Sequence, residues 1–221
     1  ILIDLAASHE VDHHVLLRGS GLFIEDIFSG HKLINQQQFQ HILKNAEQYF
    51  RNQDISFLFG QRSLTTPFND AIKAMLYSSS LDDALNRYLT FFASVSPWLC
   101  PRIMYSSDQI HLYWLDENKI ENRFFIESAM SAIQALSRQL YQSKLPWTFE
   151  FNFNEPDYIE QYWTHLGGDL TFNRPMNMMS LPSHFIHEPL PGASATLATI
   201  SHQQALQYMS AQHLQQFFFF F

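Results

Sequence analysis

The sequence has very little cysteine and no long apolar run, and both shortages exclude classes of protein. Cys100 is the only cysteine among the 221 residues, which excludes an internal disulfide, a zinc ribbon and a redox-active cysteine pair and favours a reducing compartment. No apolar segment approaches the ~20 residues of a membrane-spanning helix. The first ten residues, ILIDLAASHE, also lack the basic start and long apolar centre of a signal peptide. We therefore expect a cytoplasmic protein with no membrane partner.

Basic residues are scarce as well. Lys and Arg total 13 against 21 Asp and Glu, which gives a formal net charge of -8. A surface that binds nucleic acid needs clustered Lys and Arg to neutralise phosphates. The charge balance therefore argues against DNA binding by this chain, and any DNA contact would have to come from another segment.

Hydrophobic residues make up 46% of the sequence, enough to bury a substantial core in one domain or in two packed lobes. Phenylalanine is abundant, with 21 residues, but five of them form the terminal run Phe217 to Phe221. Five consecutive exposed phenylalanines would promote aggregation. We interpret residues 217–221 as an artefact and leave them out of the fold prediction.

The stretch from residue 147 to 191 predicts a strand, a helix and two more strands. Phenylalanines alternate with polar residues over 149–153, a period of two that is typical of a strand with one apolar face. Pro156 suits the first turn of a helix. Residues 170–172 and 176–181 have strand composition and are separated by a turn at Asn-Arg-Pro. A sheet of this kind needs other elements to cover it.

Helical periodicity appears elsewhere in the chain, together with one hairpin. We predict helices over 3–18, 36–51, 68–77, 81–95, 120–142 and from 194 onward, a hairpin over 102–105 and 109–115, and a short apolar segment over 55–59. The predicted fold class is α+β, with a helical lobe over about 1–96 packed against a lobe over about 97–193 that contains a small mixed or antiparallel sheet.

His9-Glu10-Val11-Asp12-His13 matches the H-E-x-x-H pattern. On a helix this spacing places two imidazoles on one face for zinc and supplies a glutamate as general base. No third ligand stands at the spacing that extended versions of the motif require. We therefore assign no metal, and a zinc-dependent hydrolase using His9, His13 and Glu10 is an alternative only.

Four segments at characteristic spacing resemble a known family. They are LLRGSGL at 16–22, FLFGQR at 57–62, MLYSSSLDDALNRYLTFF at 75–92 and LTFNRPMNMMSLPSHFIHEPLPGA at 170–193. Together they resemble the N-terminal effector-binding and dimerisation domain of AraC-type (AraC/XylS) transcription regulators, in the α+β branch that lacks the cupin-like barrel. The resemblance extends from about residue 9 to 210.

The resemblance implies a domain over 1–193 that senses a small molecule, a linker or dimerisation helix over 194–216, and a homodimer. It also implies that two helix-turn-helix units, absent from this chain, make the DNA contact. No catalysis and no cofactor are expected. A plain protein-interaction domain, with the Gln-rich last helix as its contact, is a further alternative.

Aromatic residues and two arginines are candidates for an effector pocket, because small-molecule sites are mostly apolar with a few polar groups. The candidate ligand-binding residues are Tyr88, Phe92, Trp98, Arg102, Tyr113, Arg123 and Phe125. Pairing with either arginine would make the small organic effector an acid. We expect it to lie between the helical lobe and the sheet.

Overall fold

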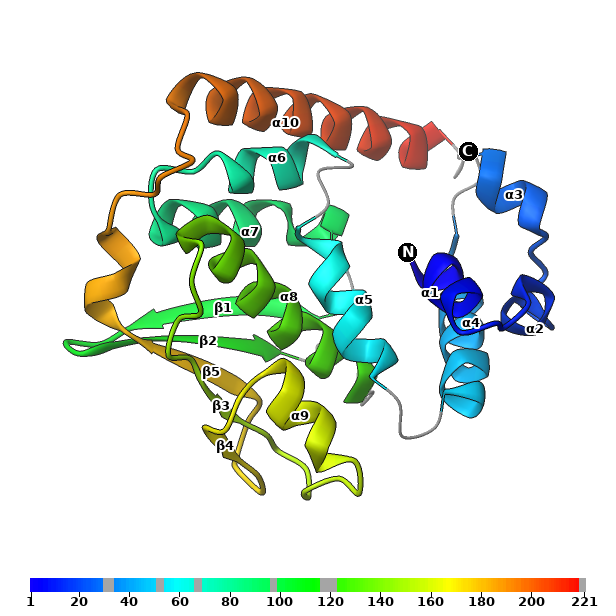
Figure 1. The fold of residues 1–221 in the computed structure, drawn as a ribbon. Helices are drawn as coiled ribbons and strands as arrows, with labels where there is room; N and C mark the ends of the chain where they lie inside the picture. The colour runs from blue at the N-terminus through cyan, green and yellow to red at the C-terminus, as the bar shows by residue number, and fades with distance from the viewer. Residues whose placement is uncertain (30–33, 51–53, 66–68, 96–98, 116–122, 219–221) are drawn as a thin grey trace.

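The computed structural model describes residues 1–29, 34–50, 54–65, 69–95, 99–115 and 123–218, and in these residues five strands form one sheet (Figure 1). The strands are β1 (Cys100–Tyr105), β2 (Gln109–Leu115), β3 (Thr148–Glu150), β4 (Leu170–Thr171) and β5 (Met178–Pro182). Their order is β1-β2-β5-β3-β4, and only β3 and β4 run parallel. The sheet is mixed, and with the surrounding helices it confirms the predicted α+β class.

The hairpin of β1 and β2 follows directly from the alternation in the sequence. Ile110, Leu112 and Trp114 are buried on one face of β2, and the residues between them are half-buried on the other. The backbone N–H of Ser106 donates to the carbonyl of Gln109 at 2.8 Å and closes the turn. The predicted hairpin is confirmed, with β1 starting two residues earlier than expected.

Helices α7 (Leu81–Val95) and α8 (Arg123–Tyr141) lie against one face of the sheet, and α5 (Ile55–Ser63) packs along α8 (Figure 1). The backbones of α5 and α8 approach closely, because a Cβ at Gly60 would lie 2.1 Å from the carbonyl oxygen of Ser128. Only glycine fits at such a contact. The apolar segment predicted at 55–59 is the first half of α5, a helix that the sequence pattern did not indicate.

The N-terminal residues form four helices beside α5, namely α1 (Leu2–Ser8), α2 (His13–Leu17), α3 (Ile24–Ser29) and α4 (Gln36–Tyr49) (Figure 1). The single helix predicted over 3–18 is wrong, because Glu10 has a φ of 61° and interrupts it. Helix α4 is confirmed. It begins with a capping box in which Asn35 and Gln38 exchange side-chain and backbone hydrogen bonds.

The predicted strand, helix, strand, strand order is also confirmed, with α9 (Ile159–His165) between β3 and β4 and a short 3-10 helix, η1 (Ser183–His187), after β5. The backbone N–H of Phe151 donates to the carbonyl of Thr171 at 2.8 Å, so pairing continues just beyond β3. Phe151 is fully buried and stacks on Phe172.

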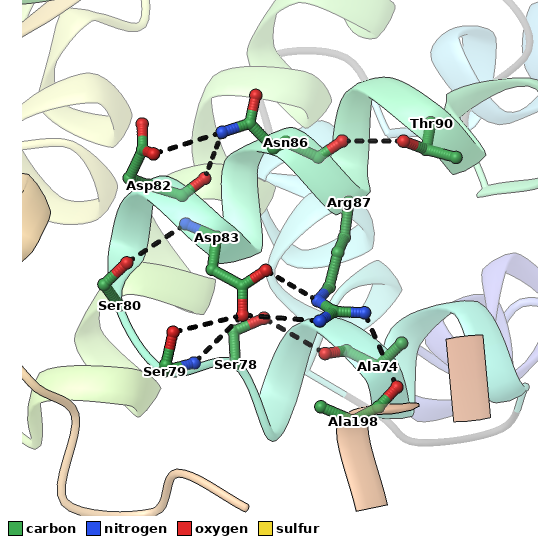
Figure 2. A network of polar contacts seen from close by, with 10 residues as sticks. All are labelled: Ala74, Ser78, Ser79, Ser80, Asp82, Asp83, Asn86, Arg87, Thr90 and Ala198. Carbon is green, nitrogen blue, oxygen red and sulfur yellow. Dashed lines mark hydrogen bonds and ion pairs between the residues drawn. The ribbon is translucent and has the colours of Figure 1, made fainter. Parts of the chain in front are cut away.

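The last helix, α10 (Ala195–Phe218), lies along α6 (Asp70–Leu76) and beside α7 (Figure 1). A small apolar cluster joins the three helices through Ala71, Ala74, Phe91 and Ala205. The Ser80 hydroxyl caps α7 by accepting the N–H of Asp83 at 3.2 Å (Figure 2). Within the described residues, no helix is long and apolar enough to cross a membrane.

Candidate functional site

A pocket of about 500 Å³ opens at one end of the sheet, beside the first turn of α8. Its walls come from the residue before β1, the end of β2, the start of α8, the chain after β3 and the loop before β5. The lining residues are Leu99, Trp114, Leu115, Arg123, Ile126, Asn152, Phe153, Pro175, Met176 and Asn177. Most of these side chains are apolar. The polar ones are one cation and two amides, a combination typical of a pocket for a small organic molecule.

Arg123 is the charged group of this pocket. Its guanidinium carbon lies 4.6 Å from the centroid of the Phe153 ring, a cation–π contact that holds the side chain across one wall. Burial by itself lowers the pKa of Arg123, but the hydrogen bond to Tyr158 and the nearby carboxylate of Glu127 outweigh burial and raise it. Arg123 therefore stays cationic and can pair with an anionic ligand group.

Behind Arg123 lies a buried carboxyl group, that of Glu127, one turn further along α8. Its side chain accepts hydrogen bonds from the hydroxyls of Ser56 at 2.5 Å, Tyr162 at 2.5 Å and Tyr158 at 2.9 Å. Burial raises the pKa of Glu127, while these three hydrogen bonds and Arg123 act in the opposite direction. The network joins α5, α8 and the region of α9 at the back of the pocket.

The two tyrosines of the network stay protonated. Burial, followed by the charge of Glu127, raises the pKa of Tyr158 to about 12. The same causes raise the pKa of Tyr162 further above its ordinary value. Both phenols therefore act as hydrogen-bond donors to Glu127 at neutral pH and hold its carboxyl group in one orientation.

The structure brings only some of the predicted ligand residues to this pocket. Arg123 lines it directly. Tyr88 is buried next to it, and its hydroxyl accepts the indole N–H of Trp114, a lining residue, at 3.3 Å. Phe92 is half-buried against the main core. Phe125 is buried, and its ring centroid lies 6.2 Å from that of Phe39.

Two of the other predicted residues lie on the opposite face of the sheet. Arg102 and Tyr113 are directly paired across β1 and β2, and Tyr113 alternates with the buried residues of β2. Arg102 is exposed and contacts the thiol of Cys100 and the carbonyl of Pro101. Trp98 lies outside the described residues.

Sequence reasoning missed several residues of this site, notably Phe153, Asn177 and Glu127. Phe153 stood in the sequence only as part of an alternating strand. Glu127 is 3% exposed on a helix whose apolar line the sequence predicts well. A glutamate inside a run of buried positions is the one signal that could have identified it, because a buried carboxyl group needs partners.

The H-E-x-x-H pattern does not form the helix that zinc binding would need. Helix α1 ends at Ser8 and α2 begins at His13, so the two imidazoles do not share one helical face. The Nδ1 atom of His9 lies 2.9 Å from the carbonyl of Leu5, and its ring packs edge-on against Phe50. The nearby carboxylate of Asp12 caps α2 by accepting the N–H of His14 at 2.8 Å.

Comparisons with known proteins agree with this fold. The family model described as the arabinose-binding domain of AraC transcription regulator, N-term, matches residues 11–190, which is most of the chain. The solved structure of the transcriptional regulator CdpR from Pseudomonas aeruginosa has a similar fold, with a TM-score of 0.55 and 13% sequence identity. The match covers 90% of this chain but only 59% of that chain. No curated protein matches the sequence.

Proposed function

This chain belongs to the family of the N-terminal arabinose-binding domain of AraC transcription regulators, and from that premise we propose that it senses a small organic acid and controls a separate DNA-binding domain. The proposed DNA-binding domain carries two helix-turn-helix units and follows α10 in the parent protein. The net charge of -8 supports this division, because the basic surface for DNA then lies outside this chain. The chain itself has no catalytic role in this proposal.

The effector binds in the pocket at the start of α8. The observation that carries this assignment is Arg123, a cation held over the Phe153 ring in the wall of an otherwise mostly apolar pocket. A carboxylate would pair with the guanidinium, and the apolar part of the ligand would contact Trp114 and Met176. A ligand bound in this pocket would contact both the sheet and α8.

Ligand binding reaches the DNA-binding domain through α7 and α10. Trp114 lines the pocket and donates its indole N–H to Tyr88 of α7. The neighbouring Arg87 pairs with Asp83 at 3.0 Å and donates to the carbonyl of Ala198, near the start of α10 (Figure 2). A ligand that favours one position of α7 thereby shifts the population of α10 orientations.

The exposed face of α10 forms the dimer contact in this proposal. Leu197, Ile200, Leu206 and Tyr208 are 44%, 48%, 39% and 61% exposed. Apolar side chains gathered on one exposed helix favour burial against a second copy. Replacing Leu197 and Ile200 by Gln should convert a dimer into a monomer in size-exclusion chromatography with light scattering, with Glu160→Gln, an exposed change on α9, as the control.

The coding sequence beyond Gln216 tests the regulator proposal directly. We expect a basic segment that contains two helix-turn-helix patterns. A coding sequence that ends without such a segment would overturn the proposal. A thermal-shift screen of small organic acids tests the sensing role, because a ligand at 100 times its Kd should stabilise the fold by about 2.7 kcal/mol.

A further inference from the structure

A second hollow, of about 520 Å³, lies at the other end of α8 between α5, the last turns of α8 and the end of α9. Its chemistry is unlike that of the first pocket. Ten of its eleven lining residues have polar side chains, and the exception is Ala135. Two of the ten, Arg138 and Lys144, are cations, and no Asp or Glu is among them.

The positive charge of this hollow comes from Arg138 and Lys144. Among the described residues, neither Arg138 nor Lys144 has a carboxylate within ion-pair distance. Asp54, which contacts the lining residue His165, is already paired with it at 2.8 Å. Two uncompensated cations on a protein of net charge -8 make this hollow a local site of positive potential.

The floor of the hollow is rigid. The buried side chain of Gln134 donates to the carbonyl of Leu166 at 2.6 Å, and buried Ser131 donates to the carbonyl of Phe57 at 2.8 Å. The imidazole of His165 is held between Gln61 and Asp54 and stacks on Phe57. These contacts fix polar groups in place before any ligand arrives, which lowers the entropy cost of binding.

The position of Lys144 depends on a glycine. Gly167 has a φ of 116°, and a Cβ at this residue would lie 2.9 Å from the Nζ atom of Lys144. A side chain at residue 167 would therefore be strained and would displace the ammonium group. The local backbone thus leaves room for a cation at the rim of the hollow.

We propose that this hollow is a second binding site, which takes a small polar anion bearing a phosphate or carboxylate group, with Arg138 and Lys144 as its counter-charges. Side-chain amides and hydroxyls from Gln61, Gln139 and Thr164 supply hydrogen bonds to the polar remainder of the ligand. The site is separate from the pocket of Arg123 and does not depend on the role of the chain in transcription. An apolar acid would fit the first pocket, whereas this hollow would leave its apolar part facing polar groups.

Calorimetric titration of the whole chain with sodium phosphate, and separately with sodium acetate, tests the proposal at constant ionic strength set with sodium chloride. We expect saturable binding of at least one of the two anions. Arg138→Gln and Lys144→Gln should each weaken it about tenfold, because each removes a charge-assisted hydrogen bond. Arg62→Gln is the matched control, since Arg62 is an exposed cation of α5 outside the hollow, and it should change the affinity less than twofold.

The outcomes distinguish a phosphate-bearing ligand from a carboxylate-bearing one. Saturation by phosphate alone identifies a phosphate-bearing ligand, and saturation by acetate alone identifies a carboxylate-bearing one. Heat that never saturates would overturn the proposal. So would an equal heat when sodium chloride is titrated in place of phosphate or acetate. Binding that Arg123→Gln removes and Arg138→Gln leaves intact would also overturn it, because the anion would then occupy the first pocket.

Discussion

Helix α8 has a cavity at each end, and each cavity has an arginine, but the two arginines lie in different surroundings. Arg123 lies over an aromatic ring and next to the buried carboxyl group of Glu127. Arg138 is exposed beside amides and hydroxyls, with no carboxylate in its pocket. The comparison shows that the fold surrounds the same residue type with mostly apolar groups at one end of α8 and with polar groups at the other.

The difference arises from how much of α8 is covered. Residues 124–134 are buried on every side, because the sheet lies on one side and α5 on the other. From Ala135 onward the helix has an exposed side, and Arg138 and Gln139 face water. Charged groups in the first part must therefore have partners inside the protein, whereas those in the second part do not need them.

Removing Glu127 should have the largest effect and should show that only the first end of α8 depends on its polar groups for stability. Glu127→Ala leaves the buried hydroxyls of Ser56 and Tyr162 and the half-buried hydroxyl of Tyr158 without their acceptor, so we expect a loss of about 3–5 kcal/mol in the free energy of unfolding. Urea denaturation followed by circular dichroism measures it. Arg138→Gln is the contrast and should stay within about 0.5 kcal/mol of the parent protein. Equal losses in the two variants would contradict the comparison.

Arg123→Gln should weaken the binding of an apolar acid and leave the binding of its neutral analogue unchanged. Phenylacetate and phenylacetamide make a suitable pair of probes because they differ in charge and little in shape. We expect the variant to bind phenylacetate about tenfold or more weakly, because it loses a charge-assisted hydrogen bond, and to bind the amide unchanged. Calorimetric titration measures both affinities.

Arg102→Gln is the control for that experiment, since Arg102 lies on the opposite face of the sheet. It should leave both affinities unchanged. If Arg102→Gln weakened phenylacetate binding and Arg123→Gln did not, the ligand would lie on the outer face of the sheet and the pocket assignment would fail.

The pH dependence of stability should also distinguish the two ends. Burial raises the pKa of Glu127 above its ordinary value of 4.5, so the folded protein keeps this proton to a higher pH than the unfolded chain does. Unfolding between these two pKa values releases the proton, and stability contributed by Glu127 is lost as the pH rises through the window. Relative to Glu127→Gln, which cannot titrate, the parent protein should become less stable from about pH 4.5 upward.

Thermal denaturation at several pH values measures this difference. The Arg138→Gln variant should follow the parent protein across the same range. A parent protein that gained stability relative to Glu127→Gln as the pH rose would show that the three hydroxyls and Arg123 outweigh burial and lower the pKa of Glu127.

The smallest effect should come from the link between α7 and α10. Arg87→Gln removes the ion pair with Asp83 and the contact with Ala198, and we expect a cost of about 0.5–1 kcal/mol because the pair is only partly buried. Combining Arg87→Gln with Trp114→Phe in a double-mutant cycle should give a coupling energy that grows when phenylacetate is bound. Coupling that is zero with and without ligand would exclude this route.

Elements with strong local signals were predictable because their causes lie within a few residues. The hairpin of β1 and β2, α4 and α7 all formed where periodicity predicted them, and in the structure Asn35 and Ser80 cap the two helices. Helix α5 was missed because its nine residues have no clear polar face, and Gly60 within it looked like a stop. The break at Glu10 was missed because the local sequence fits a continuous helix.

The sequence by itself determined the α+β class, the order of the elements from α7 to β5 and Arg123 as a candidate ligand group. Tertiary structure alone decided the pocket, because Trp114, Arg123, Phe153 and Asn177 come from four separate segments that meet through the pairing of β2, β3 and β5. It also decided that Arg102 and Tyr113 lie apart from Arg123, since the face of a strand that is covered depends on packing. Periodicity acts over a few residues, whereas a binding site depends on contacts between residues far apart in the chain.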